Sequence, residues 1–172
     1  SDNREEVTRL LASRFVNVSP AAAKYEEISI IDMLRRELPS HLECSSDNSI
    51  ALSESLLADH ILRGIEGCED KGLSSTDRTE VIRKLKECRK SDGGFAWFSG
   101  MRSSVYATAA VLENMAAMRE GLTAELADLI PDALIYMHKK CKTDDELYLY
   151  MRALYADVKL PKAEVPTRVL RK

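Results

Sequence analysis

Apolar residues recur every three or four positions along most of the chain, which is the spacing of amphipathic helices. No stretch of useful length alternates apolar and polar residues as a half-buried β-strand does. The sequence therefore predicts an all-α fold of about seven helices in antiparallel hairpins. The apolar faces that define helices are Val7, Leu10, Leu11 and Phe15; Ile28, Ile31, Leu34 and Leu38; Ile50, Leu57, Ile61 and Ile65; Val81, Leu85 and Cys88; Val105, Ala109, Leu112 and Ala116; and Leu147, Tyr150, Met151 and Leu154.

Prolines, glycines and capping residues predict where these helices begin and end. Pro39 is expected to end the second helix, and the stretch Gly64–Gly67 the third. Pro131 interrupts a later helical pattern and predicts two short helices, 123–129 and 131–140. The predicted N-terminal caps are Asp77 with Glu80, Ser103 or Ser104, Thr123, and Thr143 with Glu146.

The composition is that of one globular domain. Its 172 residues are 45% hydrophobic and 31% charged, which is a soluble balance, and the net charge of -3 disfavours general nucleic-acid binding. No apolar run reaches the roughly 18 residues that a membrane-spanning helix needs, so no direct membrane insertion is expected. The chain opens at Ser1 without a leader pattern, so we expect a segment of a larger multidomain protein. The basic stretch 159–172, which holds two prolines, is expected to be a linker or a frayed end.

The four cysteines suggest no metal or redox chemistry. Cys44, Cys68, Cys88 and Cys141 form no Cys-x-x-Cys pair, so neither a zinc ribbon nor a redox pair is expected. The three disulfide pairings that four cysteines allow stay open. We predict no metal ion and no cofactor for this chain.

One loop, residues 91–100, holds three of the seven glycines, two of the three phenylalanines and the only tryptophan. Its paired glycines allow a positive φ and a tight reversal, and its aspartate can accept backbone N–H bonds in an Asx turn. We expect its aromatic side chains to fold back between helix pairs as an architectural corner; the alternative is an exposed platform for a sugar, lipid or peptide. The candidate residues of this loop are Asp92, Gly93, Gly94, Phe95, Trp97 and Phe98.

The same loop begins a longer recognisable run. DGGFAWFSG at 92–100 is followed by SSVYATAAVL at 103–112. This run resembles the signature of bacterial α2-macroglobulin-like proteins, in which a DGGF-x-WF-x-G loop precedes a helix with the pattern SS-x-Y-x-TA-x-VL. LYLYMRALY at 147–155 is similar to a later helix of the same domain. The DGGF loop alone also occurs in terpene cyclases and prenyltransferases, which share the α/α toroid fold.

The resemblance implies a thioester-type domain, an α/α toroid or part of one. In that family a Cys-x-Glu-Gln motif just before a helix forms an internal thioester that captures proteases. Cys44 stands here at the position of the cysteine, Ser46 at that of the glutamate and Asp47 at that of the glutamine. Asp47 has no carboxamide from which ammonia could leave, so the resemblance implies a degenerate thioester position. A full domain of this family has more helices than this chain predicts, which implies a fragment or a reduced version.

From this resemblance we expect a non-enzymatic domain of a bacterial, extracytoplasmic protein of the periplasm or cell envelope. The parent protein is expected to act as an endopeptidase inhibitor by non-covalent conformational trapping. The implied partners are neighbouring β-domains of the same parent chain and a target protease.

Two other functions stay open at this stage. A toroid enzyme of the terpene cyclase or prenyltransferase type would need acidic clusters or a zinc site. The run Asp144-Asp145-Glu146 is the acidic cluster of note, and it also suits a helix cap. The second alternative is a carbohydrate- or peptide-binding module that uses the aromatic loop. A Cys–His catalytic pair formed by His41 and Cys44 is not expected.

Overall fold

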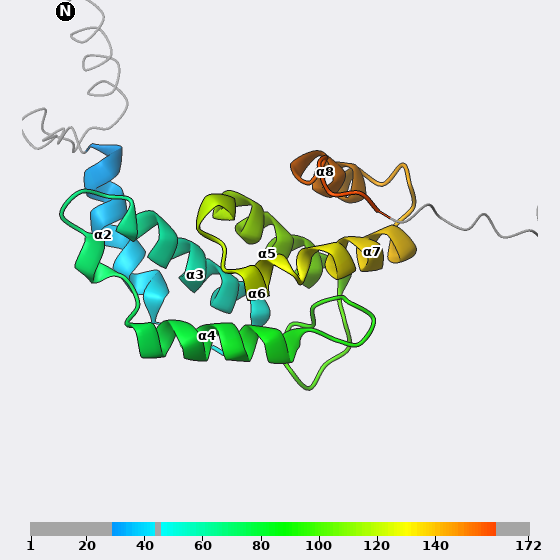
Figure 1. The fold of residues 1–172 in the computed structure, drawn as a ribbon, viewed down its shortest axis with the longest axis horizontal. Helices are drawn as coiled ribbons and strands as arrows, with labels where there is room; N and C mark the ends of the chain where they lie inside the picture. Colours follow the sequence, from blue (N-terminus) through cyan, green and yellow to red (C-terminus); the bar gives the residue numbers. More distant parts are fainter. Residues whose placement is uncertain (1–28, 44–45, 161–172) are drawn as a thin grey trace, which may run out of the picture. The chain divides into compact units, whose positions relative to one another are not determined.

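The computed structural model describes residues 29–43 and 46–160 (Figure 1). The chain divides into two compact units, residues 1–33 and 34–172, and the described helices belong to the second unit apart from residues 30–33. The apolar face predicted from Val7 to Phe15, and all but the first two residues of the predicted linker 159–172, lie outside the described residues.

The described part of the chain is helical, which confirms the predicted all-α fold. It consists of α2 (Ile30–Leu42), α3 (Ser49–Arg63), α4 (Ser75–Cys88), α5 (Val105–Ala117), α6 (Ala124–Ala127), α7 (Ile130–Lys140) and α8 (Glu146–Leu154), with 3-10 turns at Glu69–Lys71 and Arg119–Gly121. Two isolated β-bridges between α4 and α5 are the strand-like pairings within these described ranges. Helix α5 packs against α3, α7 and α8, while α4 lies along α3 (Figure 1). Closure of these helices into a toroid is not confirmed and stays a prediction.

Several predicted helix ends are confirmed. Ser104 is the N-cap of α5, where its hydroxyl accepts a hydrogen bond from the Ala107 N–H, and Gly64 is the C-cap of α3. Pro131 lies in the first turn of α7, directly after the short helix α6. A proline is tolerated there because the N–H that it lacks would have no partner within the helix. The predicted split into two short helices is therefore confirmed.

Pro39 does not end a helix, so that prediction is wrong. Helix α2 continues through Pro39 to Leu42. A proline in the last turn removes one backbone hydrogen bond, to the carbonyl four residues earlier. Few helical residues follow it, so a bend at the proline would displace little of the helix. The helix therefore ends three residues beyond the proline.

Two predicted caps are wrong by two or three residues. The cap of α4 is Ser74: its hydroxyl accepts from the Asp77 N–H and donates to the Asp77 carboxylate, over 2.6 Å. The cap of α8 is Asp145, whose carboxylate accepts from the N–H groups of Leu147 and Tyr148. In both places several Ser, Thr and Asp residues stand in a row, and the backbone conformation decides which one caps.

The buried face of α3 also differs from the predicted one. Ile50, Leu57 and Ile61 are only partly buried, while Ile65 is buried as expected. Helix α3 carries apolar residues on more than one side and contacts both α4 and α5, so helical spacing alone does not select its innermost stripe. The buried residues of the helix are Ser49, Leu52, Ser53, Ser55, Leu56, Ala58, Asp59 and Leu62.

A buried carboxylate on α3 fixes the connection to α4. Asp59 is 0% exposed and accepts hydrogen bonds from the Leu73 N–H, over 2.7 Å, and from Arg63 Nε, over 2.9 Å. Arg78 Nη1 on α4 lies 3.1 Å from its other oxygen. A buried charge needs such partners, because an isolated carboxylate in the protein interior is strongly destabilising. Asp59 therefore holds the start of α4 against α3.

Candidate functional site

The loop of residues 89–104 joins α4 to α5 and is tied to both helices. Isolated antiparallel bridges pair Arg89 with Phe95 and Ala96 with Ser103. The Phe95 N–H donates to Thr108 Oγ1 on α5 over 2.8 Å, and the Phe95 carbonyl accepts from the N–H of residue 104 over 2.8 Å. The part of the loop nearest to the helices is therefore held in place by backbone hydrogen bonds.

Asp92 organises the turn as the sequence predicts. One carboxylate oxygen accepts from the Gly94 N–H over 3.1 Å, which is the predicted local turn contact. The other oxygen accepts from the Ser103 hydroxyl over 2.6 Å, across the loop. Both oxygens of Asp92 are therefore engaged inside the loop.

The paired glycines allow the loop to lie directly on α7. Gly93 has a φ of +90°, and a Cβ at that residue would lie 2.5 Å from the Asp132 carbonyl oxygen. A Cβ at Gly94 would lie 2.8 Å from ring carbons of Tyr136. Real Cβ atoms do not make such contacts, so this backbone requires glycine at both positions. Close packing against α7 therefore explains why glycine stands at both positions, without a bound ligand.

The three aromatic side chains of the loop have different environments. Phe95 is 0% exposed and belongs to the main core, in agreement with the predicted corner. Trp97 is 40% exposed and Phe98 46%, so the prediction that they also fold back into the core is wrong. Both lie in the tip of the loop, between the two bridged residues Ala96 and Ser103.

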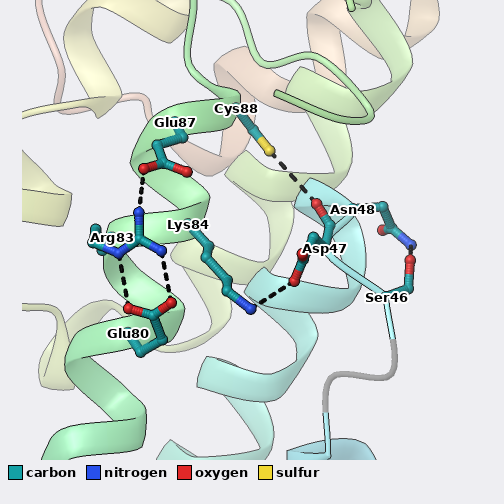
Figure 2. Close-up of polar contacts among 8 residues, drawn as sticks. All are labelled: Ser46, Asp47, Asn48, Glu80, Arg83, Lys84, Glu87 and Cys88. Atoms are coloured by element: carbon teal, nitrogen blue, oxygen red, sulfur yellow. Dashed lines mark hydrogen bonds and ion pairs between the residues drawn. The ribbon is translucent and has the colours of Figure 1, made fainter. Parts of the chain in front are cut away.

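The predicted degenerate thioester position lies directly before α3. Cys44 lies outside the described residues, whereas Ser46 and Asp47 are described (Figure 2). Ser46 Oγ accepts from the Asn48 side-chain amide over 2.9 Å, and Asn48 Oδ1 accepts from the N–H of residue 51 and caps the helix. Sequence analysis missed this cap, although asparagine before an apolar helical run is a usual signal of a helix start.

Asp47 is held by an ion pair with α4. Its carboxylate lies 2.8 Å from Lys84 Nζ, and the hydrogen bond with Asp47 raises the pKa of Lys84 (Figure 2). Lys84 is therefore an ammonium group at neutral pH and not an amine nucleophile. The pair holds the Asp47 side chain against Lys84 of α4.

Cys88, the last residue of α4, lies between the two candidate regions. Its thiol is 3.8 Å from the Asp47 carbonyl oxygen (Figure 2). Its own carbonyl accepts from the Ala96 N–H over 2.9 Å. Burial raises the pKa of the Cys88 thiol, which therefore stays protonated and unreactive at neutral pH. The structure thus places this cysteine as a packed thiol next to the segment 46–48.

A backbone hydrogen bond joins the two candidate regions directly. The N–H of Ser49, the first residue of α3, donates to the Trp97 carbonyl over 2.8 Å. The segment 46–48 and the aromatic loop therefore meet at the start of α3, although the whole of α3 and α4 separates them in the sequence. Sequence analysis named both regions but gave no reason to place them together.

The basic residues of α4 are balanced by acids. Arg83 lies between Glu80 and Glu87 and bonds to both, with 2.6 Å from its guanidinium to Glu80 (Figure 2). Lys86 Nζ lies 2.9 Å from a Glu125 carboxylate oxygen. This face of α4 therefore consists of ion pairs rather than of free positive charge for an anionic ligand.

Other site features are few in the described ranges. A shallow surface hollow of about 440 Å³ lies beside the loop, against α7. Residues 29–43 and 46–160 hold no group of three or more His, Cys, Asp or Glu residues that could bind a metal ion. In the same ranges no helix has the length and apolarity to cross a bilayer. The hollow is lined by Ser91, Asp92, Gly93, Asp132, Ile135, Tyr136, Lys139 and Lys140.

Comparisons with protein-family models, with curated proteins and with solved structures find no match to this chain. The resemblance to the macroglobulin thioester domain therefore rests on the motifs of the sequence and stays a prediction.

Proposed function

We propose that this chain is a thioester-type helical domain, with its thioester chemistry lost, of a bacterial α2-macroglobulin-like protein of the cell envelope. The parent protein inhibits endopeptidases by conformational trapping without a covalent bond. The domain itself is non-enzymatic: it acts as a rigid body against neighbouring β-domains of the same parent chain.

One observation carries this proposal: Ser46 and Asp47 lie immediately before a helix and next to the loop that bears the family-like signature. In the family that the sequence resembles, the reactive Cys-x-Glu-Gln motif also lies just before a helix. The hydrogen bond from the Ser49 N–H to the Trp97 carbonyl joins the two stretches on which the resemblance depends. Two motifs that resemble one family, far apart in the sequence and close in the fold, support a common origin in that family.

The chemistry of Asp47 supports the loss of the thioester. An internal thioester forms when a cysteine sulfur attacks a glutamine carboxamide and ammonia leaves. Asp47 instead presents a carboxylate, 2.8 Å from the Lys84 ammonium. A carboxylate in an ion pair is a poor acceptor for a sulfur nucleophile, because attack would have to expel an oxygen anion from a group that already carries charge. Trapping by the parent protein would then depend on shape alone.

Methylamine labelling tests the chemistry. Intact mass is measured under denaturing conditions with and without methylamine, and free thiols are then counted by alkylation. We expect no adduct and four alkylated thiols, one for each cysteine of the chain. Uptake of one methylamine with release of one thiol would show that the unaltered chain holds a thioester, and would refute its loss.

A restored motif gives the matched experiment. The double change Ser46→Glu with Asp47→Gln recreates the Cys-x-Glu-Gln pattern after Cys44. We expect this variant to take up one methylamine, because it regains a carboxamide at the position that the resemblance assigns. No uptake by a variant that melts like the unaltered chain would count against Cys44 as the reactive position.

Trapping is tested on the parent protein. A protease incubated with it should lose activity toward a large protein substrate and keep activity toward a small chromogenic peptide. The complex should separate fully in denaturing detergent, since no covalent bond forms. Equal inhibition toward both substrates, or a complex that resists the detergent, would contradict non-covalent trapping.

A further inference from the structure

The tip of the aromatic loop exposes large apolar side chains on a fixed backbone. Residues 97–102 are all exposed, directly after Ala96, which is 0% exposed. Within these six positions, Trp97 is 40% exposed, Phe98 46% and Met101 51%. The bridge between Ala96 and Ser103 closes the tip, so these three residues lie within one short turn of the chain.

Hydrogen bonds hold the backbone of the tip. The Trp97 carbonyl accepts from the Ser49 N–H over 2.8 Å, and the Phe98 carbonyl accepts from the Met101 N–H over 2.9 Å. The next carbonyl, of Ser99, accepts from Lys90 Nζ. A fixed backbone has already lost the conformational freedom that a flexible loop would lose on binding. The tip is therefore preorganised, and its apolar side chains remain in water.

The residue types at the tip are ones that are common in protein-binding surfaces. Tryptophan, phenylalanine, methionine and arginine are enriched at the centres of protein interfaces, and exposed apolar clusters on a soluble domain mark such sites. A carbohydrate site would also need free amide or carboxylate groups for the sugar hydroxyls. The carboxylate of the loop, on Asp92, has both oxygens engaged within the loop.

The charges around the tip indicate the chemistry of the partner. Arg102 is exposed, and no carboxylate among the described residues pairs with it. The ammonium group of Lys90 lies at the Ser99 carbonyl on the same tip. Arg89 pairs with Asp132 on α7 and so contributes little free charge. Lys90 and Arg102 outnumber the carboxylate of the loop, on Asp92, so the tip carries a small excess of positive charge on a chain whose net charge is -3, and it complements carboxylates.

We propose that the tip, residues 97–102, docks a peptide segment of a partner protein in which apolar side chains stand next to Asp or Glu. The apolar side chains of the segment cover Trp97, Phe98 and Met101, and its carboxylates pair with Arg102. This inference uses only the loop tip and does not rest on the proposed function.

Selection from a displayed library of random peptides tests the proposal. The immobilised full chain is the bait, and bound peptides are sequenced and resynthesised. Their affinities are measured from the fluorescence of Trp97, which is the only tryptophan of the chain. We expect selected peptides to pair apolar residues with Asp or Glu, and to bind the double variant Phe98→Ser with Met101→Ser about tenfold more weakly.

Two further variants test the role of the positive charge and the location of the docking surface. Arg102→Glu keeps the apolar tip and should weaken the same peptides about tenfold, with a smaller dependence on salt. Leu149→Ser alters an equally exposed apolar residue on α8, 53% exposed, and should leave the affinities unchanged. Because Arg102 is exposed, its variant tests the proposal even where the double variant melts early.

Four results would overturn the proposal. Peptides that bind both tip variants as well as the unaltered chain would place the docking surface elsewhere. Selected peptides without carboxylates would refute the stated partner chemistry. Self-association of the chain that is lost in the double variant would make a second copy the occupant. Binding of glycans on an array, with no peptides selected, would make the occupant a carbohydrate.

Discussion

Replacing Phe95 by alanine should destabilise the whole domain, since this side chain joins the loop to the core. Phe95 is 0% exposed and is among the largest fully buried side chains of the described residues. Its N–H and carbonyl also bond to α5 and its cap, so the backbone cannot easily shift to fill a cavity. Phe→Ala changes at buried positions remove about 3–5 kcal/mol from the free energy of unfolding.

Phe98→Ala is the matched control three residues later in the same loop. Phe98 is 46% exposed, so alanine removes roughly half of the contact that a buried phenylalanine makes, or about 1 kcal/mol. Each 1 kcal/mol lowers the melting temperature of a domain of this size by about 2–4 °C. We therefore expect a fall of about 6–20 °C for Phe95→Ala and about 2–4 °C for Phe98→Ala.

Thermal unfolding followed by far-ultraviolet circular dichroism measures both variants, and Trp97 fluorescence reports on the loop in the same samples. For Phe95→Ala, loss of the helical signal and the change in Trp97 emission should occur in one transition. Equal melting temperatures for the two variants, or a Trp97 transition well below the helical one, would show that the loop is not part of the core. The structural interpretation of Phe95 would then be wrong.

Three further predictions concern other parts of the fold. Asp59→Asn should remove about 1–3 kcal/mol of stability in urea unfolding, because two partly exposed arginines lose the carboxylate to which they bond; a loss near zero would mean that Asp59 is not the junction of α3 and α4. Gly94→Ala should cost about 1–3 kcal/mol, because its Cβ would meet the Tyr136 ring, whereas Gly100→Ala, with no atom near its Cβ, should cost little; similar losses would contradict this packing. Burial raises the pKa of the Tyr155 hydroxyl above its ordinary value of 10, so the unfolded chain loses this proton at a lower pH than the folded chain does. The stability that the protonated Tyr155 contributes is therefore present below pH 10 and is lost as the pH rises above it. Tyr155→Phe should therefore reduce the fall in melting temperature above pH 10, at a cost of about 1 kcal/mol at neutral pH for the lost hydrogen bond; an unchanged pH profile would rule out this titration.

The sequence predicted the helical elements well, because each depends on neighbours a few residues away. Apolar spacing identified α3, α4, α5 and α8, and Pro131 marked the boundary between α6 and α7. The caps of α4 and α8 were predicted at the wrong residues because Ser, Thr and Asp residues stand in rows before both helices, and all of them can accept a backbone N–H. Pro39 does not end its helix as predicted, since a proline in the last turn costs only one hydrogen bond.

The candidate site could be predicted only in part. The composition of the loop singled out residues 91–100, and local chemistry gave the turn at Asp92. The sequence could not show that Phe95 is buried while Trp97 and Phe98 are exposed, since all three residues are aromatic and lie within four positions of one another. Nor could it pair Asp47 with Lys84, which lies 37 positions later.

By itself, then, the sequence determined the all-α class, most helix positions and the turn chemistry of the loop, because backbone propensity and periodicity act over a few residues. Only the tertiary structure decided which stripe of α3 is innermost and that Gly93 and Gly94 lie against α7. It also decided that the segment before α3 meets the aromatic loop. These outcomes depend on which helices pack together, and contacts between residues distant in the sequence leave no periodic signal in it.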